Sequence, residues 1–131
     1  MPKFKKFLGF TMIELLVVTT IMIILSTIGL ASYRITAKNA RDSKRRADLE
    51  TVRQALVLRR SDIGSYPSDS GTGAYEDITD VLMTDGYLSS PKPRDPKYPD
   101  SEYTYAGDGV SFTLTAILEN QIPTAYSVTS P

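Results

Sequence analysis

The chain has 131 residues, enough for one compact domain and an appended segment, because single domains usually take about 100 to 150 residues. It contains no histidine, cysteine or tryptophan, which removes the commonest general base, the thiol nucleophile and any disulfide. Its 15 basic and 15 acidic residues cancel overall but are sorted along the chain. This composition argues against an enzyme, and we assign no catalytic residues.

The first predicted element is a helix long and apolar enough to cross a membrane. Residues 15 to 32 run for eighteen positions without a charge, close to the ~20 residues that span a hydrocarbon core of ~30 Å. Three lysines precede this run, so we expect the amino terminus in the cytoplasm and the rest of the chain outside. A secretory signal peptide is the alternative, but its apolar core takes only about 7 to 15 residues.

Glu14 interrupts the apolar sequence that starts at Phe10. A carboxylate at mid-bilayer costs about 2.5 to 3.5 kcal/mol, so such a residue has either a function or a way out of the hydrocarbon. The distance to the head-group layer is short: Glu14 lies four residues after Phe10, about 6 Å along a helix, so its carboxylate could reach that layer. The residues alone leave both interpretations open.

The segment GFTMIELLVV, which starts at Gly9, resembles the processing site of type IV prepilins and of the pseudopilins of type II secretion. The resemblance lies in a glycine, a phenylalanine, a glutamate four residues on and an apolar run. It implies that a prepilin peptidase removes residues 1–9 as a leader and methylates the new amino terminus, Phe10. It also implies that Glu14 pairs with the amine of Phe10 on a neighbouring subunit, and in a dry bundle each of these charges needs the other.

The same resemblance implies a location and partners. The precursor would be a single-pass protein of the cytoplasmic membrane, which an inner-membrane assembly platform polymerises with other copies into an extracytoplasmic or cell-surface filament. Residues 10–33 would form the transmembrane and filament-core part of the helix. The family usually has a proline where this chain has Ala31 and often a glycine where it has Ile23, so its usual helix-weakening residues are missing here.

We predict that the same helix continues outside the membrane through residues 34–63, which are rich in helix-forming residues and contain no proline. At about 1.5 Å per residue, a helix from 10 to 63 would be roughly 80 Å long. Apolar residues at helical spacing predict the seam on which a head packs: Leu49, Val52, Leu56 and Ile63. Nine basic residues against three acidic ones between 34 and 60 could also bind nucleic acid, although solvated helix faces are commoner.

Residues 64–131 are predicted to form a small globular head, beginning with a stop at Gly64 and a loop. A short helix is expected at about 75–85, with Gly86 as its C-terminal stop. Its buried face would carry Ile78, Val81 and Leu82. The four prolines within residues 90–100 exclude a regular element and predict an ordered loop.

A β-hairpin is predicted at about 103–118, turning at Gly107-Asp108-Gly109. Apolar residues alternate with polar ones along its second strand and should line one buried face: Val110, Phe112, Leu114, Ala116 and Leu118. A weaker strand at about 124–129 would complete a three-stranded antiparallel sheet laid on the helix seam. The predicted fold class is therefore α+β and pilin-like.

Acidic residues of the head raise two further interpretations. Major pseudopilins carry a calcium ion in their C-terminal loop, and oxygen ligands are present here at Asp95, Asp100, Glu102 and Asp108. The acidic, glycine-rich ending of that family is missing, so we assign no metal ligands and expect no cofactor. A carboxylate pair such as Asp95 and Asp100 could serve hydrolysis, but nothing in the sequence holds the two at a defined separation.

Three functions follow from these features. The first is a structural subunit of a type IV pilus or pilus-like filament. The second, within the same family, is a major-type pseudopilin of a type II secretion system. The third is a membrane-anchored extracytoplasmic enzyme or binding domain, which would need a pocket with convergent polar groups.

Overall fold

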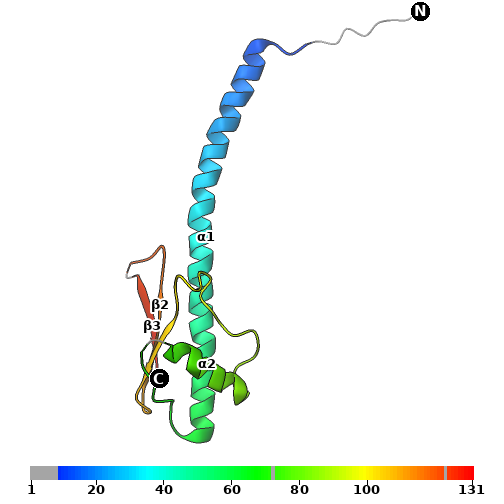
Figure 1. Cartoon of the computed structure of the whole chain (residues 1–131). Helices are drawn as coiled ribbons and strands as arrows, with labels where there is room; N and C mark the ends of the chain where they lie inside the picture. The colour runs from blue at the N-terminus through cyan, green and yellow to red at the C-terminus, as the bar shows by residue number, and fades with distance from the viewer. Residues whose placement is uncertain (1–8, 72, 123) are drawn as a thin grey trace, which may run out of the picture. The chain divides into compact units, whose positions relative to one another are not determined.

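The computed structural model of the protein describes residues 9–71, 73–122 and 124–131. The elements along this part of the chain are α1 Met12–Ile63, α2 Ala74–Thr84, β1 Thr104–Gly107, β2 Phe112–Ile117 and β3 Ala125–Thr129 (Figure 1). A 52-residue N-terminal helix and a three-stranded antiparallel sheet make the fold α+β, which confirms the predicted pilin-like architecture. The chain forms two compact units, which we call the N-terminal unit, up to Thr36, and the head unit, from Ala37 to Pro131.

The N-terminal unit is built from the first part of α1. An eighteen-residue stretch of this helix has a mean hydropathy of 2.3, and none of the stretch is buried. The large apolar side chains there are exposed by 47% at Val18 and by up to 90% at Met12. This stretch has the length and composition of a membrane span or of a signal sequence.

Threonines in the apolar stretch satisfy their hydroxyl groups on the helix itself. The hydroxyls of Thr19 and Thr20 both donate to the carbonyl of Leu16, and Thr27 donates to the carbonyl of Ile24. Such bonds leave no free donor on these side chains, which suits an environment without water.

The head unit has its own apolar core, in which the second part of α1 contacts the sheet and α2. Leu49, Val52 and Leu56 are fully buried, as the predicted seam requires, and Ala55 joins them. Ile63 does not, because 52% of its surface is exposed. It is the last residue of α1, and the chain turns away at Gly64 with a φ of 93°, beyond the part of the helix that the core covers.

The sheet is a meander in the order β1-β2-β3 with antiparallel pairing throughout. Phe112, Leu114 and Ala116 of β2 face the core, as the alternation predicts, and Leu118 is also buried. Val110 was expected on the same face but is 72% exposed. It precedes β2 in the turn after Asp108, whose carboxylate accepts the Val110 N–H at 2.9 Å, so the strand alternation has not yet begun there.

The short helix α2 contacts the core through Ile78 and Leu82, whereas Val81 is 41% exposed and differs from the prediction. Ala74, Tyr75 and Thr79 take the remaining buried positions. The helix ends at the predicted glycine: Gly86 has a φ of 81°, and the Tyr87 N–H donates to the Leu82 carbonyl at 2.9 Å. This bond and that of Gly86 to Met83 form a Schellman motif.

Candidate functional site

The predicted cleavage junction lies just before α1. Gly9 and Phe10 are outside any helix or strand, and both are exposed, Phe10 by 84%. No other part of the described structure comes within 4 Å of a Cβ placed on Gly9. The rest of the predicted leader, residues 1–8, lies outside the described residues. The junction therefore has the accessibility that a peptidase needs.

Glu14 closes the first turn of α1 by a reciprocal pair of hydrogen bonds with Thr11. Its carboxylate accepts the Thr11 backbone N–H at 2.9 Å and the Thr11 hydroxyl at 2.8 Å, and its own N–H donates to that hydroxyl oxygen at 3.3 Å. This arrangement is a capping box, which satisfies two N–H groups that a helix start otherwise leaves free. The Thr-x-x-Glu spacing of residues 11–14 is the sequence signal that indicates such a box.

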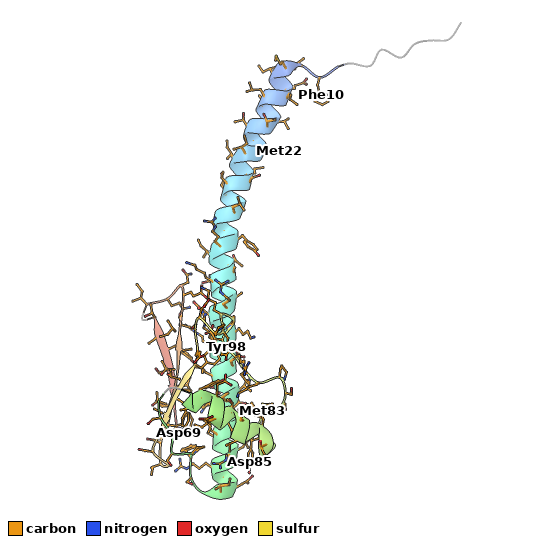
Figure 2. All side chains as sticks on the ribbon, viewed as in Figure 1. Phe10, Met22, Asp69, Met83, Asp85 and Tyr98 are labelled. Atoms are coloured by element: carbon orange, nitrogen blue, oxygen red, sulfur yellow. The ribbon has the colours of Figure 1, made fainter. Side chains whose placement is uncertain are left out.

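The surface around Glu14 is a shallow apolar groove. Its volume is about 320 Å³, and its lining residues are Phe10, Ile13, Glu14, Val17 and Val18. Figure 2 shows Met22 projecting from α1 and places Phe10 at the N-terminal end of this helix, just before its first residue. Glu14 is the one charged residue between positions 9 and 33. The groove thus presents a single carboxylate on an apolar surface, which suits a cation carried by another apolar helix.

A second group of charged side chains lies in the head unit around the buried Asp42, Arg45 and Asp95, and we call it the Arg45 cluster: Arg41, Asp42, Arg45, Asp95, Lys97 and Glu119. Arg45, only 1% exposed, donates to both Asp95 carboxylate oxygens at 2.7 and 3.0 Å. It also donates to Asp42 at 2.8 Å and to Glu119 at 3.0 Å. One guanidinium group therefore connects α1, the proline-rich loop and the β2–β3 connection.

The β2–β3 connection is held to α1 by more than this one residue. The Asp42 carboxylate accepts the backbone N–H groups of Glu119 and Asn120, at 2.9 and 3.0 Å. Arg41 donates twice to the Glu119 carboxylate, each time at 2.7 Å, and Asn120 donates to the Asn39 side-chain oxygen at 2.7 Å. Residues 39, 41, 42 and 45 of α1 thus fix the connection that begins after Leu118.

These contacts keep the three carboxylates of the cluster ionised. Burial alone would raise the pKa of Asp42 and of Asp95, but hydrogen bonds from backbone N–H groups and from Arg45 outweigh it and lower both pKa values. The bond from Arg41 lowers the pKa of Glu119, and Asp95 raises the pKa of the Arg45 guanidinium. The cluster is therefore an assembly of full charges at neutral pH.

The structure does not bring the suggested calcium ligands together. Asp95 is engaged by Arg45, and Asp108 caps its own turn by accepting the N–H groups of Val110 and Ser111. Within residues 9–71, 73–122 and 124–131, no three acidic side chains lie close enough to share a metal ion. The four suggested ligands therefore do not form one group in the described part of the chain.

No protein-family model, curated protein or solved structure matches this chain.

The Arg45 cluster was missed at the level of the sequence. In the sequence, Asp42 and Arg45 are part of a charged helix, and Asp95 is one of the four oxygen ligands suggested for calcium. The three-residue spacing of Asp42 and Arg45 is an ordinary helical ion-pair spacing. Only the fold shows that Asp95 and Glu119, which are 50 and 74 residues away from Arg45, complete the cluster.

Proposed function

We propose that the protein is a structural subunit of a type IV pilus or pilus-like filament, cut between Gly9 and Phe10 by a prepilin peptidase and polymerised through α1. The observation that carries this proposal is Glu14, one carboxylate on the exposed apolar face of α1, four residues from the amine that cleavage would create. In a membrane anchor that served only as a tether, this charge would do no more than cap the first turn of the helix, whereas in the proposed filament it also pairs with the amine of a neighbouring copy.

The exposure of α1 supports the same function. Apolar side chains that no other element of the described chain covers need lipid before assembly and other helices afterwards, because leaving them in water costs about 25 cal/mol for each Å². A filament whose subunits bundle their α1 helices provides that cover. The head unit, which has a core of its own, would then coat the filament.

The pairing of Glu14 changes at cleavage in this proposal. In the uncut chain its carboxylate caps the first turn of α1 by accepting the Thr11 N–H. Removal of the leader gives Phe10 a positively charged, methylated amine, and that amine pairs with Glu14 of the next copy within the bundle. Both charges leave the lipid at the same step, so each offsets the desolvation of the other.

The proposed partners follow from this cycle. They are a prepilin peptidase, an assembly platform in the cytoplasmic membrane, and other copies of the same chain. The precursor is placed in that membrane and the mature protein in an extracytoplasmic filament. Neither catalysis nor a metal ion is part of the proposal.

Cleavage is tested by co-expressing the full chain with a prepilin peptidase and measuring the intact mass. The expected product lacks residues 1–9 and carries one methyl group on Phe10, whereas Gly9→Ala stays full length. A Gly29→Ala variant is the matched control and should be cut like the wild type, because Gly29 lies well inside α1. Equal processing of Gly9→Ala and wild type would reject the proposed junction.

Assembly is tested with Glu14→Leu. This variant should enter the membrane and be cut normally, since the substitution removes a charge from the apolar stretch, yet it should yield no filaments by electron microscopy. Ile13→Leu, a conservative change in the same groove, should assemble normally. Wild-type filament yield from Glu14→Leu would contradict the pairing role.

A further inference from the structure

The largest hollow described on the head unit lies beside the Arg45 cluster. It is an open groove of about 620 Å³ between the proline-rich loop and the end of β2. The groove is lined by charged and polar side chains and by one apolar side chain, Ile117. The others are Arg45, Lys97, Asp100, Ser101, Glu102 and Glu119. Ile117 is 53% exposed, so the groove presents an apolar surface next to acidic groups.

The charges inside the head unit leave this groove negative. The cations of the Arg45 cluster are already paired with its three carboxylates at 2.7 to 3.0 Å. Asp100 and Glu102, at the rim, are exposed and form no ion pair with any residue of the described ranges. The three cations of the cluster and groove therefore face five carboxylates, which leaves two negative charges uncompensated.

The complementary charge is found on α1. Lys38 and Lys44 are exposed, and neither forms an ion pair with a residue that the structure describes. The other arginines of the same turns are used within the head unit, as in the bonds of Arg41 and Arg45 to Glu119. Both lysines are thus left to act between molecules, and their positive charge is complementary to the two uncompensated negative charges of the groove.

We propose that the groove between the proline-rich loop and β2 receives the Lys38–Lys44 turns of α1 from a second copy of this chain. Lys38 pairs with Glu102 at the rim, and the apolar stem of its side chain lies against Ile117. This inference rests on the proposed filament and identifies a head-to-helix contact that would hold neighbouring subunits in register.

The position of the two surfaces fits a stepped assembly. Lys38 lies seven residues before Arg45, a groove residue, which is about 10 Å along the helix axis. A copy that inserts Lys38 into the groove of its neighbour is therefore displaced along α1 by about that amount. The contact is heterologous, joining two different surfaces, and such contacts repeat into open filaments when the rotation does not close.

Charge reversal tests the contact in filaments sheared from cells that also produce the assembly machinery. Lys38→Glu and Glu102→Lys should each lower the yield about tenfold, because like charges then meet in the interface. The Lys38→Glu, Glu102→Lys double variant should return to within about twofold of the wild type. Asp77→Lys, an equal charge change on the exposed side of α2, is the matched control and should have no effect. Wild-type yield from both single variants, or a double variant no better than either, would overturn the proposal.

Cross-linking gives an independent reading, because the chain has no cysteine of its own. Two variants of the chain, Lys38→Cys and an epitope-tagged Glu102→Cys, are expressed in the same cells. The filaments that they form together are treated with a short bismaleimide cross-linker. A tagged dimer is expected, and none with Asp77→Cys in place of Glu102→Cys. Filaments without the dimer would reject the contact alone, whereas a cleaved wild type that forms no filaments would reject the proposed function together with it.

Discussion

The two units of this chain use apolar residues for opposite purposes. In the N-terminal unit the large apolar side chains whose positions are described are all exposed, from Phe10 to Ile35. In the head unit Leu49, Leu56 and Leu114 are fully buried among the sheet and α2. The head unit thus has a core of its own, while the apolar residues of the N-terminal unit lack cover from the described chain. Apolar residues of the head unit therefore stabilise its fold, while those of the N-terminal unit are available to partners.

The charged residues of the two units also differ in their surroundings. The N-terminal unit exposes Glu14 on an apolar face, whereas the head unit buries Arg45 among three carboxylates. A buried guanidinium is tolerated only because every strong contact around it is made within the unit. Substitutions in the head unit should therefore change its stability, and those in the N-terminal unit should change assembly.

The largest effect is expected for Arg45→Ala, which leaves Asp42 and Asp95 buried without their cation. We expect a loss of about 3 to 5 kcal/mol in the free energy of unfolding. The measurement is urea unfolding of the full chain in detergent, followed by tyrosine fluorescence, because seven of the eight tyrosines lie in the head unit. The control is Arg59→Ala, which removes a partly exposed ion pair with Asp85 and should cost at most about 1 kcal/mol. Equal losses from the two variants would contradict a structural role for the cluster.

Acid should weaken the head through the same cluster. The folded-state pKa values of Asp42, Asp95 and Glu119 are lowered, so their contribution to stability is present above the unfolded values of about 4. It is lost as the pH falls through the lower folded values. Unfolding free energies measured from pH 7 to pH 3 should therefore be nearly constant down to about pH 5 and then fall. A stability that rises on acidification would show that these carboxylates are not stabilised by folding.

A leucine pair on α1 tests the boundary between core and surface within the head unit. Leu56 is fully buried and Leu58 is 58% exposed, although they are only two residues apart. Leu56→Ala should cost about 2 to 5 kcal/mol because it leaves a cavity, while Leu58→Ala should stay within about 0.5 kcal/mol of the wild type. The same urea titration measures both. A similar loss of unfolding free energy from the two variants would mean that Leu58 also belongs to the core.

Most of the fold could be predicted because its signals are local. The uncharged run, Gly64, Gly86 and the alternation along β2 each fix an element within a few residues. Two of the misplaced residues, Ile63 and Val110, lie at the end of α1 and just before β2, where the periodicity continues but the covering structure stops. Val81 lies inside α2, on its exposed side next to the fully buried Leu82. The Arg45 cluster could not be predicted, because it joins α1 to Asp95 and Glu119 across the whole head unit, and no local pattern encodes that meeting.

The smallest effect is expected when the same substitution, glycine to alanine, is made in each of the two units. Gly86→Ala should destabilise the head by about 1 kcal/mol, because the φ of 81° that ends α2 is strained for any residue with a Cβ. Gly29→Ala should leave head unfolding unchanged, because Gly29 is an ordinary position in α1 where an added Cβ meets nothing within 4 Å. It should instead favour the helix by up to about 1 kcal/mol, measured by circular dichroism of the full chain in detergent. A change in head stability from Gly29→Ala, in the simplest case a gain, would mean that the two units unfold together and would contradict the separate roles of the two units.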